Sequence, residues 1–215
     1  MEKNAYTHIF WDFNGTIIDD FYACYQSEND LFSRYGLPKL HTAEEYKRLF
    51  SFPVKDYYAR MGFDFEKTPY ERLAAEWMED YLIHARDAGL CKDVKEALSY
   101  AAAHGVEQWV LSASEKSMLE RQLGELGVRD YFCGVLGRND INAGSKTALG
   151  VAWREAHPDA RILFLGDTDH DAATAVAMGA DCVLLTTGHS TRERLEAQPC
   201  LFLADTALDA LKKLL

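Results

Sequence analysis

Short apolar stretches alternate with longer segments of helical periodicity along most of the chain. The apolar stretches are rich in Ile, Leu, Val, Phe and Trp, which is typical of buried strands. Strands that alternate with helical segments predict an α/β fold with a Rossmann-like, mostly parallel sheet and helices on both of its faces. The predicted strands are residues 7–13, 107–114, 132–138, 161–167 and 181–187.

The segments between the last four predicted strands have helical periodicity. They predict crossover helices at about residues 115–126, 145–157 and 169–178, and a final helix at about 205–215. This alternation of strands and helices, with an oversized first connection, leads us to expect a central strand one and the strand order 3-2-1-4-5.

The connection between the first and second predicted strands is much longer than one crossover requires. Its pattern is nearly all helical: one helix is expected to end at Gly36, two short ones follow, and a fourth runs to Gly89. Thr68, Pro69 and Glu71 have the spacing of a capping box at the start of that fourth helix. We therefore expect a helical domain at 17–88, inserted into a core domain formed by 1–16 and 89–215.

Polar residues lie where the predicted strands end. Asp12 ends the first strand, Ser112 the second and Asp167 the fourth, and Lys146 opens the helix before the fourth. Open α/β sheets bind ligands at the carboxyl ends of their strands. If strand one is central, these four side chains converge at one edge of the sheet.

The converging residues suit phosphoryl transfer. Asp12 is a possible nucleophile toward phosphorus, and Asp12, Asp167 and Asp171 supply the oxygen ligands that Mg²⁺ prefers. Ser112 can donate a hydrogen bond to a phosphoryl oxygen, and Lys146 can offset the developing charge. Each signal has an ordinary structural alternative, since Asn-Gly is a common turn and Asp167 or Asp169 can be a helix N-cap. The order and placement of the whole set favour a joint site.

Charge and cysteine content narrow the classes of partner. The 215 residues carry a formal net charge of -11, which argues against general nucleic-acid or anionic-membrane binding but permits a small anion at a local site. The five cysteines form no C-x-x-C pair, and no apolar run approaches membrane-spanning length. These features predict a soluble, cytoplasmic protein with reduced thiols. The expected partner is a small phosphorylated metabolite, and the sequence does not specify the oligomeric state.

Two histidines lie near the predicted site. His170 is a candidate proton donor between two aspartates, although a solvated loop position is the more ordinary reading. His189 follows the fifth strand and either lines the mouth of the site or neighbours a helix cap. The aromatic residues of 17–88 are expected to form the core of the helical domain.

These motifs together resemble the haloacid dehalogenase superfamily, in particular its phosphatases with an α-helical cap, such as phosphoglycolate phosphatases. "DFNGT" resembles the first motif, "VLSAS" the second, Lys146 the third and "LGDTDHD" the fourth. The resemblance implies an aspartyl-phosphate on Asp12, and Mg²⁺ held by Asp12, the Asn14 carbonyl, Asp167 and Asp171. It also implies substrate phosphate contacts from a group that comprises Gly15, Thr16, Ser112, Ala113 and Lys146.

Asn14 departs from the pattern of that superfamily. The family's residue at this position binds Mg²⁺ through its carbonyl and serves as general acid and base through its carboxyl. Asn14 keeps the carbonyl and lacks the carboxyl, so acid–base catalysis worth about 10²–10⁴ in rate is expected to weaken. The prediction is a Mg²⁺-dependent phosphatase of a small phosphomonoester. The alternative is a catalytically weak or inactive protein that binds a phosphate ligand or regulates a partner.

Overall fold

A six-stranded parallel sheet forms the centre of the computed structural model, which describes residues 6–138 and 145–215. The strand order is β3-β2-β1-β4-β5-β6, so the predicted order of the first five strands is confirmed. The sixth strand was not predicted, because its three residues are too few to show a pattern. The strands are β1 (His8–Trp11), β2 (Glu107–Glu115), β3 (Gly134–Arg138), β4 (Ile162–Gly166), β5 (Asp181–Leu185) and β6 (Phe202–Ala204).

The central strand β1 is in register with both of its neighbours. His8 pairs with Glu107 of β2 and with Ile162 of β4. Since the three strands run parallel, their carboxyl ends lie at the same edge of the sheet. The residue that follows β1 therefore lies close to the residues that follow β2 and β4.

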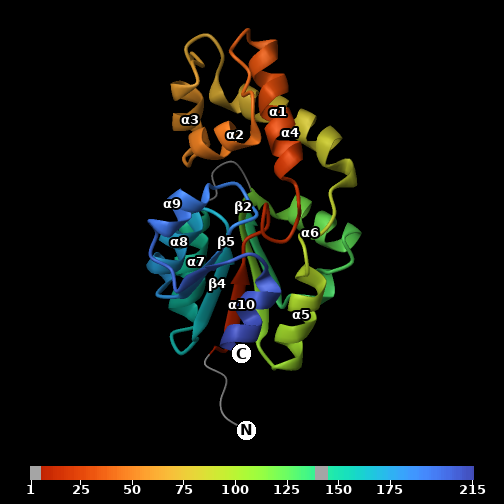
Figure 1. Cartoon of the computed structure of the whole chain (residues 1–215), viewed down its shortest axis with the longest axis vertical. Helices are drawn as coiled ribbons and strands as arrows, with labels where there is room; N and C mark the ends of the chain where they lie inside the picture. The colour runs from red at the N-terminus through yellow and green to blue at the C-terminus, as the bar shows by residue number, and fades with distance from the viewer. Residues whose placement is uncertain (1–5, 139–144) are drawn as a thin grey trace.

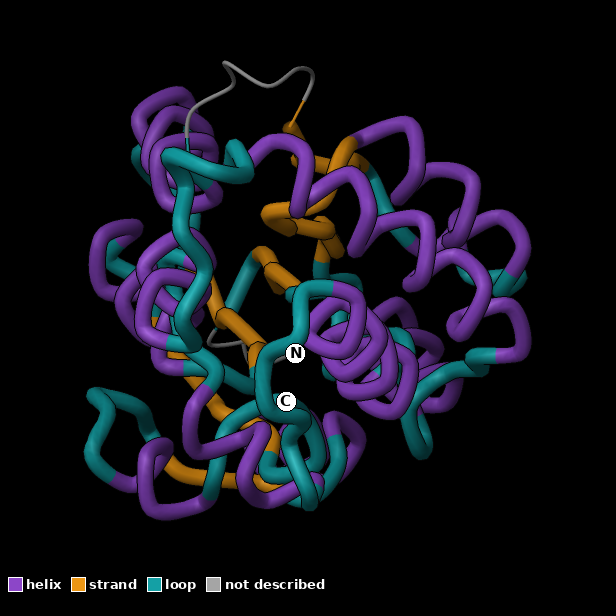
Figure 2. The backbone as a smooth tube through the Cα atoms, turned by 90° about the horizontal axis from the view of Figure 1, so that it is seen from above, coloured by secondary structure: helices purple, strands orange, loops and turns teal. Residues whose placement is uncertain are grey.

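Helices cover both faces of the sheet (Figures 1 and 2). One face packs against α5 (Val94–Ala103), α6 (Lys116–Glu125) and α10 (Ala207–Leu214). The other face packs against α7 (Lys146–Ala156), α8 (Asp169–Met178) and the short α9 (Arg192–Glu196). Successive residues of β1 supply both cores: Ile9 and Trp11 face the first layer and Phe10 the second, and all three are fully buried.

A helical lobe lies above the sheet in Figure 1 and connects β1 to β2. We define this lobe as α1 (Phe21–Arg34), α2 (Ala43–Leu49), α3 (Val54–Arg60) and α4 (Tyr70–His84). Buried aromatic rings, among them Phe32, Tyr46, Tyr57, Tyr58 and Tyr81, form its separate core. The boundaries 17–88 for a folding domain stay a prediction.

The start of α4 differs from the predicted capping box, which was wrong. The N-cap is Pro69, with no side-chain hydrogen bond, and the helix begins at Tyr70. Thr68 lies outside the helix because its backbone N–H closes a preceding turn on the Asp64 carbonyl, 2.9 Å away. The helix ends at His84 and is followed by a 3₁₀ turn, Ala85–Asp87, so it stops short of the predicted end at Gly89.

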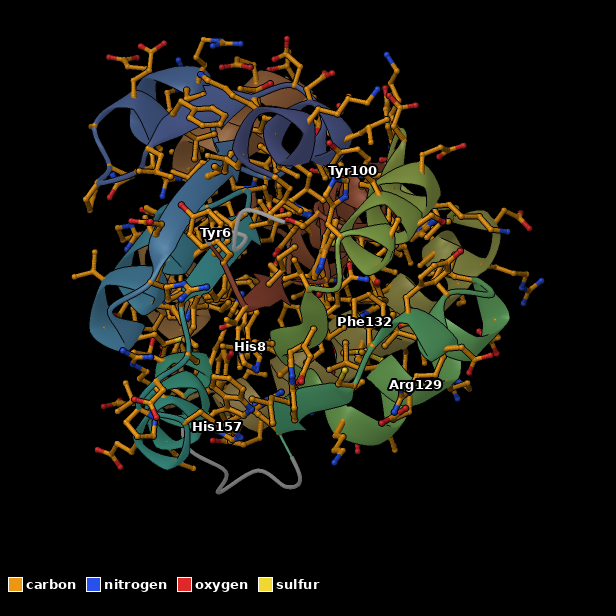
Figure 3. All side chains as sticks on the ribbon, turned by 90° about the horizontal axis from the view of Figure 1, so that it is seen from below. Tyr6, His8, Tyr100, Arg129, Phe132 and His157 are labelled. Atoms are coloured by element: carbon orange, nitrogen blue, oxygen red, sulfur yellow. The ribbon has the colours of Figure 1, made fainter. Side chains whose placement is uncertain are left out.

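The amino-terminal edge of the sheet lies opposite the helical lobe. Figure 3 views the molecule from that side and labels His8 and His157, whose ring centroids are 6.4 Å apart. His157 stacks on Trp153 with centroids 3.9 Å apart. These histidines therefore belong to a packing cluster and not to the edge where the polar residues converge. In residues 6–138 and 145–215, no helix is long and apolar enough to cross a membrane.

Candidate active site

Asp12 lies directly after β1 and is nearly buried, with 8 % of its surface exposed. Its backbone N–H donates to the Leu165 carbonyl of β4, 2.8 Å away, which fixes the residue at the edge of the sheet. The Lys146 ammonium, at the first position of α7, donates to the carboxylates of both Asp12 and Asp171. The sequence placed these three residues at one site, and the structure brings them into direct contact.

Asp167 and Asp171 are held in place by the loop between β4 and α8. Asp171 accepts hydrogen bonds through Oδ2 from the backbone N–H groups of Asp167 and Thr168, at 3.1 and 2.9 Å. Thr168 is the N-cap of α8 and forms a capping box with Asp171, so neither Asp167 nor Asp169 is the N-cap. Asp167 is fully buried and accepts from the Thr16 hydroxyl at 3.1 Å and from the His189 N–H at 2.6 Å.

The three aspartates form a compact group of oxygen ligands. Asp12, Asp167 and Asp171 each place a carboxylate oxygen within 4.8 Å of the others. Burial, followed by the charge of Asp171, raises the pKa of Asp12 well above its usual range. Burial is also the main reason that the pKa of Asp167 is raised to about 6. Carboxylates crowded in this way fit a hard divalent cation, because a cation at the group relieves their mutual repulsion.

Two glycines permit the close packing around Asp167. Gly15 has a φ of +72°, and a Cβ there would lie 2.6 Å from the Asp167 Oδ2 atom. A Cβ at Gly188 would lie only 1.9 Å from the same oxygen. Any larger residue at either position would displace the carboxylate. Thr16 is fully buried and its hydroxyl donates to Asp167, so it helps to hold the carboxylate in place.

The Asn14 side chain is bonded at both ends of its amide. Its Nδ2 donates to Asp20 Oδ2 at 2.5 Å and to the Tyr81 hydroxyl at 3.3 Å. Its Oδ1 accepts from the Ser114 hydroxyl at 3.2 Å. Asn14 therefore connects the first loop to β2 and to α4 of the helical lobe. An amide suits this position because one end must donate and the other must accept.

Asp20 is a fully buried carboxylate that the sequence analysis did not single out. Besides Asn14, it accepts from the Gly15 N–H at 3.0 Å, the Tyr81 hydroxyl at 2.8 Å and the His189 ring at 3.4 Å. Burial alone would raise the pKa of Asp20, but His189 and the other donors bring it below its usual value. The signal in the sequence that could have marked Asp20 is the carboxyl pair Asp19–Asp20, which is separated from the first motif by two residues. Its partners Tyr81 and His189 are too far away along the chain to be recognised from the sequence.

His189 is buried between the core and the helical lobe, where it lines the cavity and lies two residues before Thr191, the N-cap of α9, so both readings of its place in the sequence hold. Its ring contacts Asp20 on one side and the Tyr46 hydroxyl, 3.3 Å away, on the other. Burial would lower the pKa of His189, but Asp20 and Asp167 raise it above its usual value. Asp20, Cys24 and His189 also lie close together, but the pKa of the Cys24 thiol is raised well above its usual value by burial and by Asp20. We interpret this cluster as a hydrogen-bond network.

A cavity of about 650 Å³ lies between the helical lobe and the edge of the sheet. Asp12, Asn14, Ser112, Ala113 and Lys146 line it together with Asp171, as the sequence analysis expected for a common site. Ser112 is nearly buried and its hydroxyl accepts from the Ser114 N–H at 3.1 Å, which leaves the hydroxyl proton available for a ligand.

His170 also lines the cavity and is half-buried. Its ring stacks on Phe52 of the helical lobe, with centroids 4.8 Å apart and planes at 28°. The ordinary reading as a solvated loop residue was therefore wrong. Burial, followed by the charge of Lys146, lowers the pKa of His170, so the neutral imidazole is favoured.

The comparisons with known proteins agree with this geometry. Residues 9–185 match the family model described as haloacid dehalogenase-like hydrolase. The chain belongs to that family. The match extends from β1 to β5, so it includes the helical lobe as well as Asp12, Lys146 and Asp167.

The similar proteins include named phosphatases. A phosphoglycolate phosphatase of Pectobacterium atrosepticum is 30% identical over 133 residues, which cover 58% of this chain and 56% of that protein. One of Yersinia pseudotuberculosis is 28% identical over 115 residues, 49% of this chain and 47% of that protein. The chain therefore spans about half the length of the curated relatives it matches. A haloacid dehalogenase-like family hydrolase from Streptococcus pneumoniae has the same fold, with a TM-score of 0.83, 17% identity and coverage of 97% and 98% of the two chains.

Proposed function

We propose that this protein is a Mg²⁺-dependent phosphatase that hydrolyses a small phosphomonoester through a phosphorylated Asp12. The observation that carries the proposal is the contact of Lys146 with Asp12 and Asp171 beside the buried Asp167, all at one edge of the sheet. The residues are those required to bind a phosphate dianion next to a carboxylate nucleophile. A cytoplasmic location, in keeping with five free cysteines, is part of the same proposal.

The donor set fits Mg²⁺, since it consists of carboxylates and a backbone carbonyl. Asp12, Asp167 and the Asn14 carbonyl would hold the ion, and Asp171 would act directly or through water. When bound, the ion neutralises phosphate charge and allows two anions to approach each other. Asp171 has a second role that needs no metal, because its two oxygens anchor Lys146 and the loop after β4.

The reaction has two steps on this chain's own residues. An Asp12 oxygen attacks phosphorus, the bond from phosphorus to the ester oxygen breaks, and the ester oxygen leaves as the alcohol after it takes a proton from water. Water then attacks the phosphorus of the aspartyl-phosphate, which releases orthophosphate and restores Asp12. Lys146 and the Ser112 hydroxyl stabilise the phosphoryl charge in both steps.

Asn14 makes the proton transfers slow in this account. Its amide is bonded to Asp20, Tyr81 and Ser114 and has no acidic proton to give. Esters with good leaving groups need little protonation, so aryl and acyl phosphates are expected to be better substrates than alkyl phosphates. The second candidate function, a phosphate-ligand binder with little turnover, is favoured by the same observation.

Phosphate release from p-nitrophenyl phosphate tests the proposal. We expect activity with Mg²⁺, loss of activity with a chelator, and recovery when Mg²⁺ is restored. Asp12→Asn should lower turnover by at least about a thousandfold, because it removes the nucleophile. Asp19→Asn is the matched control, since Asp19 is exposed in the same loop. Tight phosphate binding without Asp12-dependent turnover would instead support the binder.

A further inference from the structure

The helical lobe contributes a carboxyl group to the cavity that contains Asp12. Glu28 of α1 is 1 % exposed and lines this cavity. Its Oε2 atom has no hydrogen-bond partner among the described residues. A buried polar atom that lacks a partner destabilises the folded chain, so a glutamate of this kind in the wall of a cavity suggests a ligand.

The surroundings of Glu28 contain hydroxyl groups and no cation. Burial raises the pKa of Glu28 well above its usual value. The Tyr58 hydroxyl acts in the opposite direction, because its hydrogen bond stabilises the charged form of Glu28. No ion pair among residues 6–138 and 145–215 includes Glu28. The lysines and arginines that line the cavity elsewhere are Lys146, bonded to Asp12 and Asp171, and two exposed residues, Lys55 and Arg138. His189, which also lines the cavity, contacts Asp20.

A second unpartnered polar atom belongs to the same cavity wall. The Trp77 indole Nε1 is buried and has no hydrogen-bond partner in the part of the chain that the structure describes. Trp77 lines the cavity, and its ring stacks on Tyr81. The walls between are aromatic, with Phe50, Phe52 and Tyr58 among them. Such walls pack against the carbon face of a ligand and leave its polar groups to Glu28 and Trp77.

We propose that Glu28 is a substrate-recognition residue that accepts a hydrogen bond from a hydroxyl or ammonium group on the organic part of the phosphomonoester. The proposal rests on the proposed function, because the phosphate end is assigned to Asp12, Lys146 and Ser112. The cavity thus has a phosphate end in the core and a donor-recognising end in the helical lobe.

The proposal excludes substrates that would place a carboxylate at the lobe end. No cation pairs with Glu28 among the described residues, so a ligand carboxylate at the lobe end would be buried without a counter-ion. The relatives named phosphoglycolate phosphatases act, by their names, on an ester of that kind. This chain is therefore expected to discriminate against phosphoglycolate.

Four esters of similar size test this preference: glycerol phosphate, ethanolamine phosphate, propyl phosphate and phosphoglycolate. We expect kcat/KM for glycerol phosphate or ethanolamine phosphate to exceed that for the other two by about tenfold or more, the value of a buried hydrogen bond. Calorimetric binding of the same esters to the Asp12→Asn protein with Mg²⁺ gives the same ratios without turnover.

Two variants of Glu28 and one control separate recognition from structure. Glu28→Met removes the acceptor at similar size and should abolish the preference. Glu28→Gln keeps a carbonyl acceptor and should retain the preference for glycerol phosphate while it loses any for ethanolamine phosphate. Glu79→Met changes an exposed glutamate of α4 and should leave all ratios unchanged.

The two proposals fail in different ways. Absence of Asp12-dependent turnover with every ester, including p-nitrophenyl phosphate, overturns the proposed function, and the binding ratios still decide the role of Glu28. If wild-type protein treats the four esters within threefold of one another, in rate and in binding, the recognition role is wrong. It is also wrong if Glu28→Met keeps the preference.

Discussion

At the scale of single residues, the structure changes the meaning of Asn14. The residue lacks the carboxyl expected at its position, but a carboxyl lies 2.5 Å from its amide nitrogen, on Asp20. Asp20 is fully buried and bonded to His189 and Tyr81, so it stays charged within the network. The amide of Asn14 is the donor that this arrangement requires.

Asn14→Asp should therefore have two opposing effects. A carboxylate at position 14 provides an acid–base group, but it faces Asp20 and loses the amide donor. We expect the free energy of unfolding to fall by about 1–3 kcal/mol, since a buried acceptor loses its donor and gains a like charge. Chemical denaturation measures the change.

The double variant Asn14→Asp with Asp20→Asn restores one donor and one acceptor. Stability should recover by at least about half of the loss, and turnover of alkyl phosphates should exceed that of wild type. Intact-mass analysis of wild type is needed as well, because deamidation of Asn14 before Gly15 would imitate the single variant. If the effects of the two substitutions on the free energy of unfolding simply add, residues 14 and 20 are not coupled through their hydrogen bond, and this explanation is wrong.

Glu28 predicts a pH dependence of stability. Its pKa is raised in the folded chain, so between the ordinary value of about 4.3 and the folded value the unfolded chain gives up a proton that the folded chain keeps. The contribution of Glu28 to the pH dependence is absent below about pH 4.3. Above that pH, Glu28 lowers the free energy of unfolding increasingly, by at most about 1.4 kcal/mol per pH unit.

Glu28→Met removes this contribution. The variant should gain stability relative to wild type as the pH rises above about 4.3, with a difference that grows until the raised pKa of Glu28 is reached. Denaturation at several pH values measures the difference, and Glu79→Met is the control. A difference that stays constant with pH would show that Glu28 is charged in the folded chain.

At the scale of elements, α9 connects the core to the helical lobe. Arg194 donates to the Phe50 carbonyl at 2.5 Å and to the Lys47 carbonyl at 3.2 Å, at the end of α2. The same side chain pairs with Asp169 at the start of α8. One guanidinium thus joins the lobe to the first residue of α8, two residues after Asp167.

Arg194→Met should raise KM for p-nitrophenyl phosphate by about three- to tenfold while kcat changes by less than about twofold. The reason is that the bond positions the lobe and not the reacting groups. Hydrogen exchange of α2 should also increase. Arg192→Met is the control, because that arginine pairs with Asp205 on the surface. Unchanged KM and exchange would show that the connection is unimportant.

The elements also show what sequence patterns can predict. The strands and crossover helices followed from periodicity, and the meeting of Asp12 with Asp167 followed from the expected central place of strand one, because parallel strands bring their carboxyl ends together. The capping of α4 and α8 was misassigned, because Thr68 is held in a preceding turn by the Asp64 carbonyl, whereas Thr168 is free to cap α8 together with Asp171. Glu28 resembled a solvated charge on a helix, since only packing of the lobe buries it.

At the scale of the whole molecule, the site is divided between two bodies of structure. The core supplies Asp12, Lys146 and Asp167, and the helical lobe supplies Glu28 and the aromatic walls of the cavity. Contacts from Asn14 and His189 to lobe tyrosines connect the two. Chemistry and selectivity are therefore expected to respond separately to substitution.

Asp167→Ala tests the metal site at this scale. The variant should weaken Mg²⁺ binding, measured by calorimetry, and lower phosphatase activity, because it removes one of three clustered carboxylates. Thr16→Val removes a hydrogen bond to Asp167 and should have the same effects to a smaller degree. Full activity of Asp167→Ala in chelator-treated buffer would contradict the metal hypothesis.

The central claim is that Asp12 is phosphorylated during turnover and that the amide at Asn14 slows the release of orthophosphate from Asp12. The most direct measurement is rapid acid quenching of wild-type protein turning over p-nitrophenyl phosphate with Mg²⁺, followed by peptide mass spectrometry of residues around Asp12. We predict a phosphorylated Asp12 peptide that accumulates, with a burst of nitrophenol before slower orthophosphate release. Robust turnover with no phosphate on Asp12 at any time, and with no burst, would contradict this account.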